Sequence, residues 1–300
     1  MTSAIVTGAT GFVGVHLLAE LLANNVEVWA ICRTGSQNLG RLPETVHVIY
    51  VDIDSYDSLS ELPDTGFDVF YHLAWEDASG PGRTNAAAQA KNVELALTAL
   101  ENAHRLGCGK FIALGTVYER FAPNARTRES FGGSDFYILS KDYTHAMLDK
   151  LAVKLGIPFV WATICHPIGR LIKPEQMMAS VVSSLLSGTK LPFGPGTAVY
   201  DIVAVEDVAR GLRLLGECAL TKRVYYIGSG APRRLKEYME ETRRILGTDT
   251  PIGFGERPDD GLRFEGAWFD IAPLAGETGY APSVGFEQAV LNVADGVGER

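Results

Sequence analysis

The sequence predicts an α/β fold built on a doubly wound parallel β-sheet. In the first half of the 300 residues, short apolar runs alternate with longer amphipathic segments, which is the pattern of strand–helix–strand units. The apolar runs are rich in Val, Ile and Phe and have no polar face, as expected of strands buried on both sides of a sheet. A glycine-rich turn follows the first run, where a strand would pass into a helix.

Six segments of the first half are predicted as strands because they are short, apolar and rich in β-branched residues: 3–7, 27–32, 47–51, 69–73, 110–114 and 158–164. The segments between them are predicted as helices, the last two because apolar residues recur at i, i+3 and i+4: 11–23, 58–61, 85–106 and 136–155. After about residue 165 the rhythm changes, and we expect further helices at 174–186, 205–215, 235–246, 271–278 and 286–298. The remaining predictions are a Gly/Pro-rich segment and one more strand, at 188–196 and 224–227.

Composition limits the class of protein. Apolar residues make up 46% and charged residues 21% of the chain, as in soluble globular proteins, and cysteines at 32, 108, 165 and 218 form no CxxC pair. We therefore expect reduced thiols, no disulfide and no metal centre. The 27 basic and 36 acidic residues give a net charge of −9, which argues against a nucleic-acid or anionic-membrane surface. Without a basic leader or an apolar run of membrane-spanning length, a cytoplasmic protein is expected.

The turn after the first predicted strand is typical of dinucleotide binding. Within 7–14, Gly8 allows a tight turn, Gly11 lets backbone N–H groups approach a pyrophosphate, and Gly14 lets the helix pack closely on the sheet. The alternative is an ordinary strand–turn–helix whose glycines serve packing alone. The cofactor contacts expected from this turn are Gly8, Thr10, Gly11, Phe12, Val13 and Gly14.

The ends of the next two strands bear on the choice of cofactor. The second strand lacks a carboxylate for the ribose of NAD, and Arg33 and Ser36 follow it instead, which suits the 2′-phosphate of NADP(H). NADP(H) is therefore the favoured cofactor over NAD(H); the alternative for Arg33 is a solvated loop position. After the third strand, Asp52 and Ile53 are expected to cover the adenine edge, although Asp52 equally suits a helix cap.

Tyr137 and Lys141 lie four residues apart at the start of a predicted helix and therefore share one face. A free phenol has a pKa near 10, so proton exchange near pH 7 requires a change of about 3 units, or about 4 kcal/mol. An ammonium about 4 Å away supplies about that much at an effective dielectric near 20. The spacing predicts a proton-exchanging tyrosine whose pKa the lysine lowers; the alternative is a helix-surface pair.

Four segments are characteristic in combination: 7–14, 69–74, 137–141 and 200–209. Together they resemble the extended short-chain dehydrogenase/reductase family, and within it the branch of nucleotide-sugar epimerases, dehydratases and ketoreductases. The resemblance covers nearly the whole chain. It implies an enzyme in which a Ser or Thr acts with the tyrosine and lysine above.

The resemblance also implies a division of the chain. A Rossmann domain that binds NADP is expected over 1–165, with a return in 198–230, and a smaller C-terminal α/β substrate lobe over 166–197 and 231–300. The cofactor contacts then include Leu73, Ala74, Tyr137 and Lys141. A homodimer is expected through the helices predicted at 85–106 and 136–155.

The family carries its catalytic Ser or Thr just past the fifth strand, before a Val-Tyr-Gly. Here the sequence reads Val-Tyr-Glu, and the stretch before it is two residues shorter than usual. Alignment on the strand selects Thr116, whereas counting back from Val117 gives Leu114, which has no hydroxyl. The resemblance therefore implies Thr116 as a catalytic and substrate-contacting residue; the alternative is a capping threonine.

Three further positions bear on the substrate through the same resemblance. His166 stands where the family often has Asn beside the nicotinamide and the sugar, so it contacts the substrate, serves as an additional acid, or has no role. Arg257 matches a family arginine that binds the nucleotide-sugar pyrophosphate; the alternative is a solvated arginine in a turn. Tyr200 stands where the family often has a second such arginine, which weakens the assignment of a nucleotide diphosphate.

Smaller features favour one reaction. Dehydratases of the family carry an Asp-Glu pair directly after their Thr, whereas Thr116 is followed by Val and Tyr. Dehydration is therefore disfavoured, although Glu119 leaves some room for it. Epimerases typically resemble the NAD-binding form, whereas Arg33 and Ser36 indicate consumption of NADPH. We therefore predict NADPH-dependent reduction of a nucleotide-linked 4-keto-deoxysugar. In this reaction Tyr137 protonates the alkoxide, Thr116 bonds the same oxygen and Lys141 holds the nicotinamide ribose.

Three alternatives stay open. The first is a nucleotide-sugar epimerase that retains its NAD(P), and the second is a reductase of a non-nucleotide carbonyl, which Tyr200 favours. The third is a catalytically silent protein that senses the cofactor, against which the presence of Thr116, Tyr137 and Lys141 argues.

Overall fold

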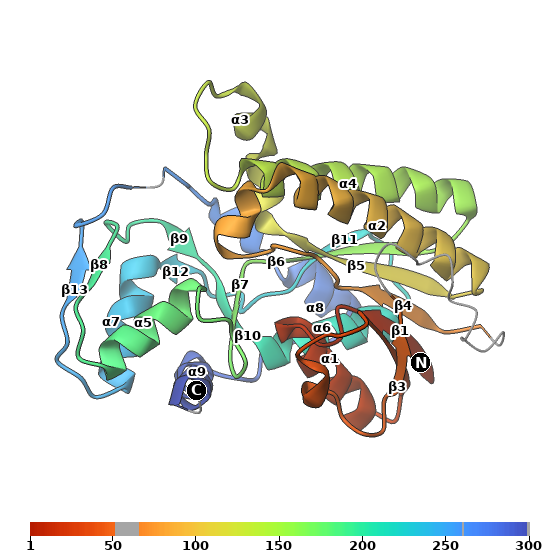
Figure 1. Ribbon diagram of the computed structural model, residues 1–300, viewed down its shortest axis with the longest axis horizontal. Helices are drawn as coiled ribbons and strands as arrows, with labels where there is room; N and C mark the ends of the chain where they lie inside the picture. The colour runs from red at the N-terminus through yellow and green to blue at the C-terminus, as the bar shows by residue number, and fades with distance from the viewer. Residues whose placement is uncertain (52–65, 260, 299–300) are drawn as a thin grey trace.

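A seven-stranded parallel sheet forms the centre of the computed structural model, which describes residues 1–51, 66–259 and 261–298 (Figure 1). The sheet order is β11-β6-β5-β4-β1-β2-β3, and every pair is parallel. The strands are β1 Ser3–Thr7, β2 Glu27–Cys32, β3 His47–Tyr50, β4 Val69–His72, β5 Lys110–Thr116, β6 Phe159–Ile164 and β11 Val224–Tyr226. The winding reverses between β1 and β4, where parallel α/β sheets bind ligands at the carboxyl ends of their strands. The predicted fold is confirmed; Asp52, Ile53 and the helix predicted at 58–61 lie outside the described residues.

Helices cover both faces of the sheet (Figure 1). One face carries α1 Phe12–Ala23, α6 Val205–Glu217 and α8 Ala272–Thr278, and the other carries α2 Ala86–Arg105 and α4 Asp135–Leu155. Alternate residues of β1 enter different cores: Val6 joins Leu17 and Leu212 on the first face, and Ile5 joins Leu100 on the second. All five side chains are fully buried, and each contributes about 1.5 to 3 kcal/mol of transfer free energy.

Local signals set some of the helix ends. The side chain of Asn85 caps α2 by accepting from the Ala88 amide at 3.2 Å, and α4 ends at Gly156 in the left-handed conformation, with a φ of +71°. Strand β5 runs two residues beyond its predicted end at 114 and places Thr116 at its last position. The helix predicted from 174 begins only at Met177, because the residue before it is in an extended conformation.

The second half builds a smaller set of elements beside the sheet. Three helices pack on one another there, α5 Met177–Leu186, α7 Leu235–Ile245 and α9 Phe286–Gly298. Three pairs of short strands join them: β7 His166–Ile168 with β10 Ile202–Ala204, β8 Leu191–Phe193 with β13 Ile252–Phe254, and β9 Val199–Tyr200 with β12 Arg233–Arg234. Strands of two or three residues show no alternation, so the sequence pattern did not predict them. Single turns complete the described elements: η1 Leu39–Arg41, η3 Gly80–Thr84, η4 Val117–Phe121, α3 Ala122–Thr127 and η5 Gly266–Phe269.

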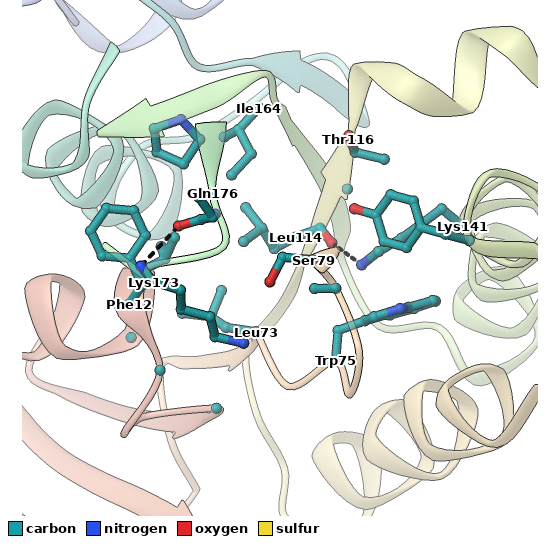
Figure 2. Close-up of a pocket in the computed structure, with 18 of the residues that line it drawn as sticks. Phe12, Leu73, Trp75, Ser79, Leu114, Thr116, Lys141, Ile164, Lys173 and Gln176 are labelled. Carbon is teal, nitrogen blue, oxygen red and sulfur yellow. Dashed lines mark hydrogen bonds between the residues drawn. The ribbon is translucent and has the colours of Figure 1, made fainter. Parts of the chain in front are cut away.

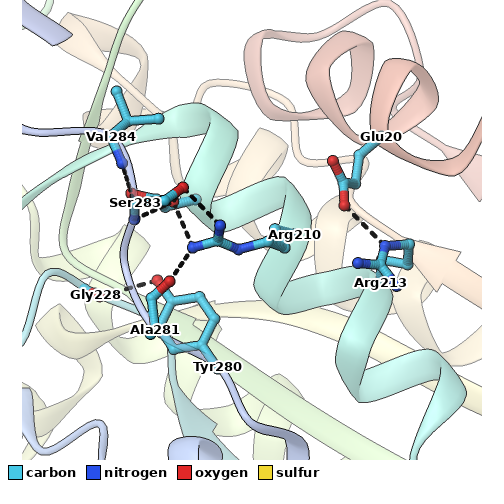
Figure 3. A network of polar contacts seen from close by, with 9 residues as sticks. Glu20, Arg210, Arg213, Gly228, Tyr280, Ala281, Ser283 and Val284 are labelled. Atoms are coloured by element: carbon cyan, nitrogen blue, oxygen red, sulfur yellow. Dashed lines mark hydrogen bonds and ion pairs between the residues drawn. The ribbon is translucent and has the colours of Figure 1, made fainter. Parts of the chain in front are cut away.

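A polar network fixes α6 against its surroundings (Figure 3). The fully buried carboxylate of Asp207 pairs with Arg210 at 2.8 Å and accepts from the Ser283 amide at 3.0 Å. Further along the helix, Arg213 donates to Glu20 of α1 at 2.8 Å. These bonds tie the C-terminal segment and α1 to the same helix, so they hold the sheet and the later elements in one arrangement.

Candidate active site

The glycine turn closes tightly between β1 and α1. Gly8 has a φ of +70°, and the Gly11 amide donates to the Gly8 carbonyl at 3.0 Å. A Cβ at Gly8 would lie 2.7 Å from the backbone of Leu73 and Ala74, and one at Gly14 would lie 2.2 Å from the Gly8 carbonyl. The turn thus packs against the end of β4 as only glycine allows, and α1 starts without a side-chain cap. This cradle fits the pyrophosphate of a dinucleotide.

Two adjoining cavities extend from this turn along the carboxyl ends of the strands. The one beside β2 is lined by Thr10, Arg33 and Glu76, among others. The Arg33 guanidinium lies 3.9 Å from the Glu76 carboxylate, and both side chains are largely exposed. Ser36 is not among the described residues that line this cavity, and its hydroxyl accepts from the Asn38 amide at 3.5 Å. The structure therefore places Arg33, but not Ser36, in the groove that extends from the glycine turn.

The second cavity brings together Thr116, Tyr137 and Lys141, hereafter the trio (Figure 2). Thr116 ends β5, while Tyr137 and Lys141 lie one turn apart on α4. The Thr116 side chain hydrogen-bonds Tyr137, which lowers the pKa of the phenol, and also accepts from the Tyr118 amide at 3.3 Å. Turn and β4 residues share this cavity, so the trio faces the cofactor groove; they are Gly8, Gly11, Phe12, Val13, Gly14 and Leu73.

The Lys141 ammonium is buried among apolar groups. Its Nζ donates to the Leu114 carbonyl at 2.8 Å and lies 3.5 Å from the centroid of the Trp75 ring (Figure 2). The pKa of Lys141 is lowered to about 7: burial is the main cause, the charge of Glu119 opposes it, and the charge of Arg83 adds to the lowering. The lysine therefore changes its protonation near neutral pH, where a solvated lysine is fully charged.

Arg83 is the cation that lies against Tyr137. Its guanidinium carbon is 4.3 Å from the Tyr137 ring centroid and 5.2 Å from that of Tyr118, and its Nε donates to the Ala78 carbonyl at 2.8 Å. Burial raises the pKa of Tyr137, and the charge of Arg83 lowers it. The charge that lowers this pKa comes from Arg83, while the lysine ammonium is engaged by a carbonyl and an indole; the expectation that Lys141 also lowers it stays a prediction.

A buried carboxylate lies behind the trio. Glu119, in η4, accepts from the Trp161 indole nitrogen with both oxygens, at 3.0 and 2.9 Å, and His145 lies 3.3 Å from it. The sequence alone gives Arg83 no role and leaves Glu119 only as an acid that a dehydratase could use. The signal for Glu119 was its place after Val-Tyr, where the family has Gly; a loop arginine such as Arg83 carries no comparable signal.

His166 lines a neighbouring cavity, which shares Arg83 with the cavity of the trio. Its ring stacks on Tyr118 at a centroid distance of 5.9 Å and meets the Tyr200 ring edge-on at 4.7 Å. Burial and the charge of Arg83 lower the pKa of His166 to about 4, so the ring is neutral near pH 7. A neutral ring suits a substrate contact better than a role as an additional acid.

Arg257 lines a third cavity, which shares Met177 and Tyr200 with the cavity of His166. The Arg257 side chain is exposed, and Asp259 lines the same cavity. The structure therefore does not bring Arg257 to the trio. The cavity of the trio, the cavity of His166 and the cavity of Arg257 instead form a series, in which the cavity of His166 is the middle one.

Comparison with known proteins identifies the family. The NAD dependent epimerase/dehydratase family matches residues 4–228. This span contains the glycine turn, the trio and strand β7 with His166. The chain belongs to this family. The resemblance to the extended short-chain dehydrogenases/reductases and their nucleotide-sugar branch is thereby confirmed, and the protein is an NAD(P)-dependent enzyme of that type.

Individual relatives are distant. A "dTDP-glucose 4,6-dehydratase" of Actinoplanes sp. is 27% identical, over 95% of this chain and 94% of its own length. The UDP-N-acetylglucosamine 4-epimerase of Methanobrevibacter ruminantium, solved with UDP-N-acetylmuramic acid, is 20% identical, with a TM-score of 0.82 over 99% of this chain and 98% of its own. The enzyme WbmF of Bordetella bronchiseptica, solved with NAD⁺, is 20% identical, with a TM-score of 0.80 over 99% and 93%. At this identity the two solved structures show the shared fold alone.

Within the part of the chain that is described, the structure has neither a helix suited to span a membrane nor a cluster of metal-binding side chains. None of its helices combines the length and the apolar character that crossing a membrane requires. Nor do any three His, Cys, Asp or Glu side chains there gather closely enough to hold a metal ion.

Proposed function

We propose that this enzyme reduces the keto group of a nucleotide-linked 4-keto-deoxysugar with NADPH. The observation that carries the proposal is the meeting of the trio with the glycine turn in one cavity, with Arg33 in the adjoining cavity of the same groove. Bound NADPH supplies the hydride. The residues of the chain supply the proton and the electrostatic environment.

Each member of the trio has a separate task. Tyr137 donates a proton to the oxygen of the reduced carbonyl, and Thr116, which is hydrogen-bonded to Tyr137, binds the same oxygen. Lys141 holds the nicotinamide ribose. Arg83 stabilises the phenolate that remains after proton transfer, because its guanidinium lies over the Tyr137 ring.

Tyr137→Phe tests the proton donor. We expect turnover to fall by a factor on the order of 10² to 10⁴ while NADPH binding is kept, because only the hydroxyl is removed. Tyr50→Phe is the matched control, since Tyr50 lies at the end of β3 and its side chain is exposed. Turnover near the wild-type value in Tyr137→Phe with bound cofactor would show that the assignment is wrong.

The residues that line the cavity of the trio favour reduction over dehydration. Elimination of water needs an acid and a base beside the sugar, yet no Asp or Glu is among the described residues that line the cavity of the trio. The residues after Thr116, Val117 and Tyr118, are buried and uncharged, and both oxygens of Glu119 bond the Trp161 indole. This supports a reductase, although the Actinoplanes relative is named a dehydratase.

The preference for NADPH rests on Arg33. We expect Arg33→Ala to weaken NADPH binding about 10- to 100-fold and to leave NADH binding little changed, because a guanidinium–phosphate bond contributes about 1.5 to 3 kcal/mol. Arg41→Ala, at another exposed arginine, is the control. Glu76→Gln is expected to strengthen NADPH binding, since this carboxylate lies 3.9 Å from Arg33. Equal losses of both cofactors in Arg33→Ala would contradict the 2′-phosphate role.

The nucleotide part of the substrate is assigned to the series of cavities. We assign the substrate lobe to 166–197 and 231–300, with 198–230 returning to the cofactor domain. Arg257 binds the diphosphate in its cavity. Arg83 presents a second guanidinium in the cavity of His166, which replaces the family's second arginine at the position of Tyr200. With NADPH bound, UDP or dTDP is expected to raise the melting temperature, and less so in Arg257→Met. No shift with any nucleoside diphosphate would remove the nucleotide from the proposal.

An epimerase is the second candidate. Glu76 at the end of the cofactor groove offers a carboxylate to a ribose hydroxyl, and both solved structures above share the fold, one being named an epimerase. An epimerase keeps its cofactor through purification and consumes none of it. Oxidation of one NADPH for each ketosugar converted would exclude the epimerase, and conversion without NADPH loss would exclude the reductase.

We also propose a homodimer through α2 and α4. The outer side of α4 exposes Tyr143, Met147 and Val153, which is a large apolar surface for a solvated helix. Light scattering is expected to give twice the chain mass for the wild type, and a monomer for Met147→Asp. A wild-type monomer would contradict this assignment without touching the reaction.

A further inference from the structure

Glu119 occupies a position where a buried acid is costly. Its side chain follows β5 in η4 and is only 8% exposed. Both carboxylate oxygens accept from Nε1 of Trp161, at 3.0 and 2.9 Å. Gly115 makes room for this arrangement, because a Cβ there would lie 2.3 Å from the same nitrogen. A glycine, an indole and a carboxylate are therefore fitted to one another directly behind Thr116.

The same indole links Glu119 to the catalytic helix. His145 and Lys141 lie one turn apart on α4 and both contact the Trp161 ring. The His145 ring stacks on it at 4.8 Å and 7°, and the Lys141 Nζ lies 5.8 Å from its centroid. The His145 Nδ1 is also 3.3 Å from Glu119, and its side chain is 26% exposed, so His145 forms the solvent side of the group.

The charges around Lys141 are otherwise unfavourable to its ammonium. The described lining of the trio's cavity includes three basic side chains and no acid: Arg83, Lys141 and Lys173. Burial and the charge of Arg83 both lower the pKa of Lys141, and Glu119 is the group that raises it. The titratable or charged groups that face Lys141 are His72 of β4, Arg83 of η3, Glu119 of η4, and Tyr137 and His145 of α4 itself.

We propose that Glu119 is a positioning residue of the active site: its carboxylate, fixed by Trp161 behind a cavity whose described lining holds no acid, is the negative charge that favours the ammonium form of Lys141. The inference rests on the proposed roles of Tyr137 and Lys141. It assigns a purpose to the Val-Tyr-Glu departure, because the Glu supplies a carboxylate where the family has a residue without a side chain.

Substitution of the charge alone tests the proposal. Glu119→Gln keeps an acceptor for the Trp161 indole and removes the charge, whereas Glu119→Asp keeps the charge. The wild type and each variant are prepared alone and combined with Lys141→Met, and the unfolding free energy of every protein is measured in urea at pH 5 to 9. For each pair, the unfolding free energy of the protein with Lys141, minus that of the protein with Met at this position, rises with pH once Lys141 loses its proton. We expect this rise to begin about one pH unit lower in Glu119→Gln and near the wild-type pH in Glu119→Asp.

Activity provides the second arm. In NADPH-dependent reduction of a nucleotide-linked 4-keto-deoxysugar, the alkaline limb of turnover is expected to move about one pH unit down in Glu119→Gln. Glu94→Gln, on the exposed side of α2, is the matched control and should leave the profile unchanged. If the wild type does not reduce such a sugar, the proposed reaction fails while the unfolding arm still decides the role of Glu119.

Two results would overturn the inference. One is an unchanged onset of the pH-dependent rise in Glu119→Gln together with a loss of stability that is equal at every pH, which would make Glu119 a structural anchor for Trp161. The other concerns folding: if Glu119→Gln does not fold, recovery in the double variant with Lys141→Met supports the charge role, and failure of the double variant refutes it.

Discussion

Replacement of Lys141 by Met is expected to make the protein more stable below pH 7 and to remove part of its pH dependence. The ammonium of Lys141 is only 5% exposed and has one hydrogen-bond acceptor, the Leu114 carbonyl. A charged amine in such surroundings loses most of its hydration, which its contact with the Trp75 ring replaces in part. Met has a similar length and carries no charge, so the variant removes this penalty with little change in packing.

The magnitude follows from the pKa of Lys141. Burial lowers this pKa from 10.5 to about 7, and at about 1.4 kcal/mol per pH unit the difference of about 3.5 units corresponds to about 5 kcal/mol. Between pH 7 and 10.5 the unfolded chain holds a proton on this lysine that the folded protein does not. Unfolding therefore binds a proton in this window, and the free energy of unfolding rises with pH. Below pH 7 both states are protonated, and the full penalty remains.

The assay is urea unfolding of wild type and Lys141→Met without cofactor, at pH 6, 7, 8 and 9. The pKa of His72, which the Lys141 charge also lowers, is about 3 and lies below this range, so the difference between the two unfolding free energies follows the lysine. From pH 7, where Lys141 is half protonated in the folded protein, to pH 9 we expect the wild type to gain about 2 kcal/mol relative to the variant. Parallel curves over this range would refute the reasoning, because they would show that Lys141 keeps its proton in the folded protein.

Two further predictions concern neighbours of this lysine. Gly115→Ala is expected to lower the free energy of unfolding by about 2 to 3 kcal/mol, because its Cβ would lie 2.3 Å from the Trp161 indole nitrogen. Gly133→Ala, a glycine with open space around it, is the control and should lower the free energy of unfolding by less than about 1 kcal/mol. Equal losses in the two variants would contradict the packing argument. Arg83→Met is expected to raise the pKa of Lys141, since the guanidinium charge lowers it. The free energy of unfolding should then begin its pH-dependent rise above pH 7. The same onset as in the wild type would show that the Arg83 charge does not reach the lysine.

The sheet and its glycine turn could be predicted because their signals are local. Each central strand is a continuous apolar run, and Gly8, Gly11 and Gly14 are imposed by contacts within a few residues of the turn or with the adjacent strand. The pairing of Tyr137 with Lys141 on one helix face follows from helix geometry alone. Strand β5 was predicted two residues too short, but alignment on it still selected Thr116, which the structure places in the cavity of the tyrosine and lysine.

What the sequence pattern did not provide is the electrostatic environment of these residues. Arg83 reaches Tyr137 from a loop 54 positions earlier in the chain, and Glu119 reaches α4 through an indole on β6. Neither distance is encoded by a period or a spacing, since both depend on how three separate elements pack at the end of the sheet. Spacing alone predicts Lys141 as a cation near Tyr137, and the structure adds that burial lowers the pKa of this lysine and that the Arg83 guanidinium lies over the Tyr137 ring. Residues that hold catalytic groups in their working protonation state are therefore found from a structure, and a departure from a family motif, such as the Glu after Val-Tyr, shows where to look.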